Sequence, residues 1–426
     1  MCSNSCDCEE LNESELAPNA GADAIASTSD DTCKTCGNTA HLVLRKKDAY
    51  CKTCFVANCT HKFRATLGKS KLLKPGDKVL VAFSGGPSSA AMLRLLRDGF
   101  SEDTHKKLLF EPSLVYVEDS SVSGTHGDVT DLMEESDFPY FTCRLDCLYS
   151  TERLKLDPST HRAEVGDGEG AARTAFATAC ESFKTLTDRE SFYRLCLRRL
   201  LLRLARDNGF AKVFTAETGT LLAATLLSTI ALGRGAQLRE EVGFLDDRDP
   251  EVLLLRPLRE FSSKEVELFN EHCNVRFRPQ TTPSTGCEPR ASVARLTAKF
   301  VNGLQENFPA TVSTVWRTGD KIESRPRARA LAAGPSSSSR CRLCDSPLDT
   351  VDVEPCSAVA ALQLTRDISR LRVAEDAKFT TSDVADNFQV ASSIFCYACQ
   401  ALVRQGDASA LSLLCDVVGA SSSSNR

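Results

Sequence analysis

Residues 78–97 of this 426-residue chain, KVLVAFSGGPSSAAMLRLLR, constrain its fold more than any other stretch. They open with a short apolar run, residues 79–83, flanked by turn-forming residues, which is typical of a strand buried on both faces of a parallel sheet. A glycine turn follows, and Ser88 or Ser89 is expected to cap the next helix. A strand, a glycine turn and a helix N-terminus in succession predict an anion-binding site, because the first helical N–H groups point at the ligand. The alternative is an ordinary strand-to-helix turn.

The central region continues by alternating strand and helix patterns. Further strands are expected at residues 113–117, 138–145, 212–215 and 252–255, and further helices at residues 173–183, 190–206, 221–232, 264–273 and 292–307. Residues 150–172 are polar and rich in glycine, so a surface loop is expected there. The alternation predicts an α/β fold, a five-stranded parallel sheet with helices on both faces. In such a sheet ligands bind beyond the carboxyl ends of the strands, which is where the glycine turn falls.

The chain contains 20 cysteines, and its polar, acidic beginning shows no secretory signal. Metal ligands and free thiols in a reducing compartment, the cytoplasm, are therefore expected rather than disulfides. No apolar run approaches the roughly 20 residues that span a bilayer, so no membrane association is expected. The net charge of −5 is too small to indicate a class of partner.

Two pairs of cysteines near the N-terminus have the spacing of a structural zinc site. They are Cys33 and Cys36, then Cys51 and Cys54, with 14 residues between the pairs. Four thiolates in two close pairs suit tetrahedral zinc. Residues 40–50 are expected to form a hairpin between the pairs. A module this small cannot fold on its own core, so the metal would be structural. Cys59 and His61 are the alternative ligands, but two complete pairs outrank them.

A second set of pairs lies near the C-terminus. Its members are Cys341 and Cys344, then Cys396 and Cys399, and 51 residues separate the pairs. Structural zinc is expected here too, in a module that holds an insertion. Unrelated free thiols are the alternative, because the spacing is less diagnostic.

Charge and composition indicate the remaining boundaries. Residues 1–32 carry eight acidic residues and no Lys or Arg, which predicts a disordered leader, and a metal role for its Cys2, Cys6 and Cys8 is left open. We divide the rest of the chain into an N-terminal zinc module (33–68), an α/β domain (69–323), a linker (324–340), a C-terminal zinc module (341–418) and a polar tail (419–426).

Positive charge is concentrated beside the glycine turn. Residues 33–97 hold 13 Lys or Arg against two Asp, which favours contact with nucleic acid over a merely solvated face. The candidate residues are Arg45, Lys46, Lys47, Lys62, Arg64, Lys69 and Lys71, with a second strip at Arg194, Arg198 and Arg203. Both strips are expected to border the carboxyl edge of the sheet.

The glycine turn resembles the pyrophosphate loop of the PP-loop ATP-pyrophosphatases, whose pattern is SGGxDS. The matching residues are Ser84, Gly85, Gly86 and Ser89, while Ser88 stands at the family's Asp position. With the cysteine pairs, residues 33–402 resemble the cytosolic tRNA 2-thiolation proteins, and most of all the second subunit of the eukaryotic pair. Active members of this wider family adenylate a uridine with ATP. They use a CxxC pair and a third cysteine, which hold an iron–sulfur cluster or act as thiols.

This chain departs from the active pattern at each catalytic position. Tyr193 replaces the first cysteine of the pair and leaves Cys196, with Cys287 as the best match for the third cysteine. The active motif TGHNADD reads TAETGTL at residues 215–221, so its His and both Asp are lost. Phosphoryl-type chemistry needs such charges to hold Mg²⁺ and stabilise the leaving group. The resemblance therefore implies a vestigial nucleotide site, no catalytic residues, no iron–sulfur cluster, and ordinary thiols at Cys196 and Cys287.

The resemblance implies a tRNA-binding, non-catalytic subunit of a heterodimeric tRNA-uridine 2-sulfurtransferase. Its partner would be a catalytic paralogue, and the sulfur donor would be a thiocarboxylated ubiquitin-related modifier protein. The substrates would be wobble uridines of tRNAs for Lys, Glu and Gln. The alternatives are an active ATP-dependent thiolase and a zinc-ribbon scaffold that does not contact tRNA. Whether ATP still binds is left open.

Overall fold

The computed structural model of the chain describes residues 32–44, 48–101, 107–119, 129–164, 169–278, 282–322, 340–349 and 394–406. The chain divides into two compact units, Met1–Asn58 and Cys59–Arg426. The leader apart from Thr32, the predicted linker apart from Arg340, and the polar tail lie outside the described residues. No helix in the described part of the chain is long and apolar enough to cross a membrane.

The N-terminal unit is built on a short hairpin, as the sequence predicts. Strands β1 (Leu42–Leu44) and β2 (Asp48–Tyr50) pair antiparallel, with Leu42 opposite Tyr50. Helix α1 (Lys52–Ser70) begins directly after β2 and continues into the larger unit.

The larger unit is organised around one sheet of eight strands in the order β6-β7-β5-β4-β3-β8-β10-β9. In sequence order these strands are β3 (Lys78–Ala82), β4 (Glu111–Glu118), β5 (Tyr140–Arg144), β6 (Lys155–Asp157), β7 (Arg162–Glu164), β8 (Lys212–Phe214), β9 (Leu245–Asp246) and β10 (Leu253–Leu255). The pairings from β7 through β10 are parallel, and β6 and β9 add antiparallel edges.

All five predicted strands are present, but the predicted strand number is wrong. The surface loop expected at residues 150–172 contains the β6–β7 hairpin, whose turn is held by Asp157 accepting hydrogen bonds from Ser159 and Thr160. Distant side chains also fix this hairpin, because the backbone N–H of Leu156 donates to Asn208 at 2.9 Å. Strands this short, held by contacts far along the chain, leave no periodic pattern in the sequence.

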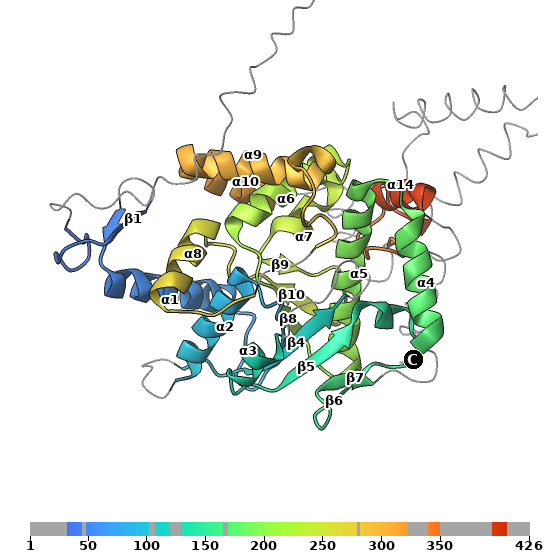
Figure 1. Cartoon of the computed structure of the whole chain (residues 1–426), viewed down its shortest axis with the longest axis horizontal. Coiled ribbons are helices and arrows are strands. Elements are labelled where there is room, and N and C mark those ends of the chain that lie inside the picture. The colour runs from blue at the N-terminus through green and yellow to red at the C-terminus, as the bar shows by residue number, and fades with distance from the viewer. Residues whose placement is uncertain are drawn as a thin grey trace, which may run out of the picture. The chain divides into compact units, whose positions relative to one another are not determined.

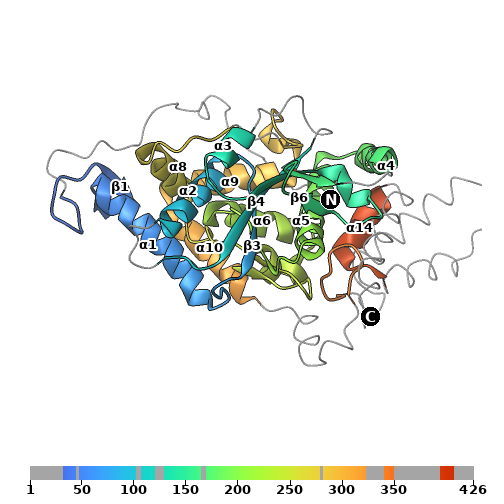
Figure 2. The ribbon, with the colours of Figure 1, turned by 90° about the horizontal axis from the view of Figure 1, so that it is seen from below.

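Helices cover the sheet on both sides. They are α2 (Pro87–Phe100), α3 (Thr130–Glu134), α4 (Glu169–Ser182), α5 (Leu186–Asp207), α6 (Gly219–Ala231), α7 (Leu238–Val242), α8 (Ser263–His272), α9 (Val293–Asn307), α10 (Pro309–Lys321) and α14 (Tyr397–Gln405). In both Figure 1 and Figure 2, α2 and α8 lie to one side of the strands, and α4, α5 and α14 lie to the other. Helices α6, α7, α9 and α10 share a second apolar core around Trp316.

Helix α2 starts earlier than the sequence predicts. Its N-cap is Gly86, and Pro87 occupies the first turn, so neither Ser88 nor Ser89 is the capping residue. Proline suits this position because its missing N–H would have no partner inside the helix.

Candidate functional site

The four N-terminal cysteines converge as the sequence predicts. The sulfur atoms of Cys33, Cys36, Cys51 and Cys54 all lie within 4.8 Å of one another. The Cys36 and Cys51 sulfurs are 3.7 Å apart. A tetrahedral metal with bonds of about 2.3 Å to sulfur places its ligands about 3.8 Å apart, so this group has the dimensions of a metal site.

Backbone geometry forms this site. The first pair lies on a tight turn in which Gly37, at φ +76°, donates its N–H to the Cys33 carbonyl at 2.8 Å. The second pair lies where β2 ends and α1 begins, and the Cys54 N–H donates to the Cys51 sulfur at 3.5 Å. Backbone hydrogen bonds, that of Cys51 foremost, lower the pKa of the Cys33 thiol to about 6. This favours the thiolate that a metal binds.

The C-terminal cysteines form a second site of the same construction. The sulfurs of Cys341, Cys344, Cys396 and Cys399 also lie within 4.8 Å of one another. Asp345, at φ +61°, takes the place of Gly37 and donates its N–H to the Cys341 carbonyl at 2.9 Å. The second pair again opens a helix, because α14 begins directly after Cys396. Hydrogen bonds from the other three thiols, Cys341 first, hold the pKa of Cys344 well below its usual range.

The two sites differ in their surroundings. All four C-terminal cysteines are buried, and they belong to the same apolar core as Leu80 of β3, Val115 of β4 and Leu200 of α5. At the N-terminal site Cys36 is exposed and Cys54 is half-buried. The C-terminal site is therefore part of the core of the larger unit.

Polar groups from distant elements surround the C-terminal sulfurs. The buried Gln237 amide donates to the sulfur of Cys396 at 3.0 Å. The Arg199 guanidinium donates to the carbonyls of Leu343 and Arg342 within the cysteine turn. Arg199 also pairs with Asp345 at 3.2 Å. No sequence signal connects Gln237 or Arg199 with the cysteines, which follow more than 100 residues later.

The glycine turn has the predicted shape. Gly85 adopts φ +78°, and a β-carbon there would lie 2.6 Å from a methyl carbon of Val129. The Ser84 hydroxyl donates to Ser89 at 3.0 Å, and Ser89 donates to the Gly86 carbonyl at 3.0 Å. The turn supplies no carboxylate, and Pro87 removes one N–H from the helix start.

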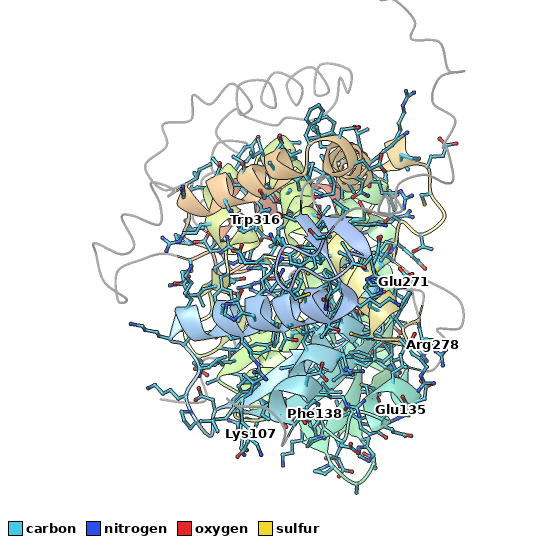
Figure 3. The ribbon with its side chains drawn as sticks, turned by 90° about the vertical axis from the view of Figure 1, so that its left-hand side faces the viewer. Lys107, Glu135, Phe138, Glu271, Arg278 and Trp316 are labelled. Atoms are coloured by element: carbon cyan, nitrogen blue, oxygen red, sulfur yellow. The ribbon has the colours of Figure 1, made fainter. Side chains whose placement is uncertain are left out.

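The segment before α9 crosses this turn. The Arg278 N–H donates to the Gly85 carbonyl at 2.8 Å. The side chain of Arg278 pairs with Asp131 at 2.8 Å, and the neighbouring Arg276 pairs with Glu135. Figure 3 shows Arg278 and Glu135 on the same side of the molecule.

Thr220 and Leu221, at two positions where the resemblance implies lost carboxylates, differ in their surroundings. Thr220 donates to Gln305 at 3.3 Å and accepts the Ser263 N–H at 3.1 Å, so it joins three helices. Leu221 is 47% exposed and offers no ligand atom. Neither position supplies the charge that Mg²⁺ requires.

The two thiols that the resemblance compares with catalytic cysteines, Cys196 and Cys287, lie outside both described four-cysteine groups. Cys196 is fully buried on α5, and burial raises the pKa of its thiol well above the usual value. Tyr193 is half-buried on the same helix, and burial raises its pKa as well. Cys287 is half-buried in the turn before α9. Within the described ranges, the two four-cysteine groups alone bring together three or more metal-ligating side chains, and neither includes Cys196 or Cys287.

The predicted basic residues have unequal environments. Arg45, Lys46 and Lys47 lie outside the described residues. Lys62 pairs with Glu265 at 2.6 Å and covers the ring of Phe261, and Arg64 donates to the Asp98 carbonyl at 3.4 Å. Lys69, Lys71 and Arg194 are exposed.

Two arginines of the α5 strip face inward. Arg203 is buried and donates to the carbonyls of Leu148 at 3.0 Å and Ser150 at 2.7 Å. The Arg198 side chain is 11% exposed and pairs with Asp246 at 2.9 Å. Both guanidinium groups are engaged inside the protein, so Arg194 alone remains from this strip as a surface contact.

The expectation that both basic strips border the carboxyl edge of the sheet is also wrong. Lys69 and Lys71 end α1 and lead into β3, so they lie at the amino end of that strand. The glycine turn follows the other end. Helix α1 was not predicted, and without it the sequence positions of Lys69 and Lys71 do not show which edge of the sheet they border.

Comparison with known proteins identifies relatives. The family model "Cytoplasmic tRNA 2-thiolation protein 2" matches residues 292–401. The Danio rerio protein of that name is 33% identical over 389 residues, covering 80% of this chain and 77% of that protein. The Bos taurus protein is 34% identical over 401 residues, covering 83% and 79%. Among solved structures, the U34-tRNA thiolase NcsA from Methanococcus maripaludis with its 4Fe-4S cluster has a TM-score of 0.52 at 19% identity, covering 71% of this chain and 93% of that one. This likeness shows a shared α/β fold.

Proposed function

Because the chain belongs to the cytoplasmic tRNA 2-thiolation protein 2 family, we propose that it is the non-catalytic, tRNA-binding subunit of a tRNA-uridine 2-sulfurtransferase. It acts in the cytoplasm on the wobble uridine, U34, of tRNAs for Lys, Glu and Gln. A catalytic paralogue is its partner, and a thiocarboxylated ubiquitin-related modifier supplies the sulfur.

One observation carries the non-catalytic assignment. The glycine turn and the sheet around it are intact, whereas Ser88, Thr220 and Leu221 supply no negative charge. Adenylation by ATP requires a metal or equivalent charges at the pyrophosphate leaving group. The fold of the site is present but these charges are absent, which supports a role in binding and positioning the substrate rather than in catalysis.

The two four-cysteine groups are proposed to hold structural zinc. Four thiolates in a closed tetrahedral group, with no ligand position left for a substrate, fit a structural rather than a catalytic site. The N-terminal zinc orders the β1–β2 hairpin against the start of α1. The C-terminal zinc closes residues 340–349 onto α14, within the core of the larger unit.

The tRNA contact is proposed for the exposed part of the basic surface. Lys69, Lys71 and Arg194 are its described members, and Arg45, Lys46 and Lys47, which lie outside the described residues, are further candidates from the sequence. Lysines and arginines of this kind bind phosphates without reading bases.

Reconstitution tests the assignment. This chain, the catalytic paralogue and their mixture are each incubated with unmodified tRNA, ATP and the thiocarboxylated modifier, and 2-thiouridine is measured by mass spectrometry. We expect efficient thiolation by the mixture alone. Thiolation by this chain without the paralogue would refute the non-catalytic assignment, and full activity of the paralogue alone would refute the requirement for this subunit.

A further inference from the structure

A group of lysines lies at the amino edge of the sheet. It consists of Lys69 in the last turn of α1, Lys71 and Lys74 in the connection, and Lys78 at the start of β3. All four are exposed, and none forms an ion pair with another described residue. We call these four residues the amino-edge cluster. The Gly76 N–H donates to the Leu109 carbonyl at 2.8 Å, which brings the exposed Lys107 next to the cluster.

Among the described residues, nearby carboxylates neutralise little of this charge. The Asp77 carboxylate forms an ion pair with Lys212 at 2.8 Å, and this contact lowers the pKa of Asp77. Asp98 pairs with Arg94 at 2.8 Å. Glu111, opposite Lys78 in the strand register, is the exposed acidic neighbour. Counted over the described residues alone, the cluster therefore keeps a net positive charge.

The cluster is remote from the glycine turn. It precedes β3, and the turn follows that strand at the opposite edge of the sheet. Strand β3, which separates the two, has five residues and spans roughly 16 Å at ~3.3 Å per residue. In Figure 3, Lys107 beside the cluster and Arg278 beside the turn lie on opposite sides of the view. A ligand that contacts both edges must be long.

The backbone at Lys71 gives a second, independent observation. Lys71 adopts φ +56°, a left-handed conformation at the end of α1. Glycine is the usual residue there because a β-carbon makes this conformation unfavourable. A lysine therefore stands at a position where glycine would relieve the strain.

We propose that the amino-edge cluster binds phosphates of the same tRNA, on an arm remote from the anticodon stem. This inference rests on the proposed function. In this proposal the anticodon stem approaches the carboxyl edge, on the side of the glycine turn, while sulfur transfer takes place on the paralogue. The rest of a folded tRNA is long enough to extend along the domain to the amino edge. Lysine suits this contact, because it binds phosphate as a point charge without sequence preference.

Variants at Lys71 separate the charge from the backbone. Lys71→Gly removes the charge and relieves the strain, so we expect an unchanged or raised melting temperature, about two- to fivefold weaker tRNA binding, and a salt slope lower by about one unit. Lys71→Ala should weaken binding equally, and Lys71→Arg should bind as wild type. Wild-type affinity of both Lys71→Gly and Lys71→Ala would overturn the proposal.

A second experiment locates the contact on the RNA. The variant Lys69/Lys71/Lys74/Lys78→Ser is compared with wild type, each as the full chain and as the reconstituted complex, on full-length tRNA and on an isolated anticodon stem-loop. We expect at least tenfold weaker binding of full-length tRNA and unchanged binding of the stem-loop. A control variant carries the same loss of charge elsewhere, at the exposed Lys155, Lys184, Lys299 and Lys321, and should bind both RNAs as wild type.

Each other outcome contradicts the inference in a distinct way. Equal weakening for both RNAs would place the cluster at the anticodon stem. Loss of the paralogue with unchanged RNA binding by the free chain would make it a protein interface. If wild-type chain and complex bind neither RNA, the proposed function itself fails. If they bind both and the variant does so equally well, the inference alone fails.

Discussion

Loss of one cysteine should have different consequences at the two four-cysteine groups, the proposed zinc sites. Cys344→Ser is expected to destabilise the whole larger unit, because its sulfur lies in the core shared by β3, β4 and α5. Cys54→Ser is the matched control, since it removes a half-buried ligand from a site in the N-terminal unit.

The magnitude follows from the metal's share of the folding energy. Structural zinc contributes ~10–16 kcal/mol in small zinc modules, so each of four thiolates accounts for roughly 3–4 kcal/mol. Cys344→Ser also loosens the turn that Arg199 and Asp345 hold. A loss of about 3–4 kcal/mol lowers the melting temperature of a domain of this size by on the order of 10 °C.

Hydrogen–deuterium exchange measured by mass spectrometry localises the effect. In Cys344→Ser we expect faster exchange in β3, β4 and α5 and a lower melting temperature. In Cys54→Ser we expect faster exchange only at residues 32–58, with the larger unit unchanged. If Cys344→Ser left exchange in α5 and β3 as in wild type, the C-terminal metal would not support the core, and the reasoning would be refuted.

Three further outcomes are expected. Gly85→Ala should lower the free energy of unfolding by about 1–3 kcal/mol in chemical denaturation, because its β-carbon meets Val129 and the backbone is left-handed; unchanged stability would contradict the described turn. Asp246→Asn should cost about 3–5 kcal/mol, since it removes the buried carboxylate that Arg198 and Arg248 share and leaves them only Asp345 and Glu241; a loss under 1 kcal/mol would contradict this. Burial would raise the pKa of Asp246, but the two arginines hold this pKa well below its usual range. The stabilising contribution of Asp246 is therefore complete above about pH 4 and is lost only as pH falls through the lowered pKa. A series of urea titrations between pH 2 and 7 in which wild type and Asp246→Asn lose stability in parallel would contradict this.

Features with a local signal were predictable from the sequence. The apolar runs of β3 and β8, the turn at Gly85 and the convergence of the cysteine pairs all follow from short stretches of chain. Helix α1 also left a signal. Its buried residues Phe55, Cys59, Phe63 and Leu67 recur every four positions, which is helical spacing.

Features held by long-range contacts were not predictable. Arg198 and Arg203 share a helix with the exposed Arg194, and only the partners of the first two distinguish them. Asp246 lies 48 residues from Arg198, and Leu148 lies 55 residues from Arg203. A charged strip on a helix therefore indicates polarity but not which of its members face solvent.

The most direct test of the non-catalytic role is the 2-thiouridine content of tRNA in cells that lack this chain. These cells are complemented with wild type or with the variant Ser88→Ala/Cys196→Ala/Cys287→Ala, which removes the side chains at three degenerate catalytic positions. At matched protein levels we expect both to restore the same 2-thiouridine content. Loss of the modification with the variant, while it still binds the paralogue and tRNA, would contradict the account and assign catalysis to this chain.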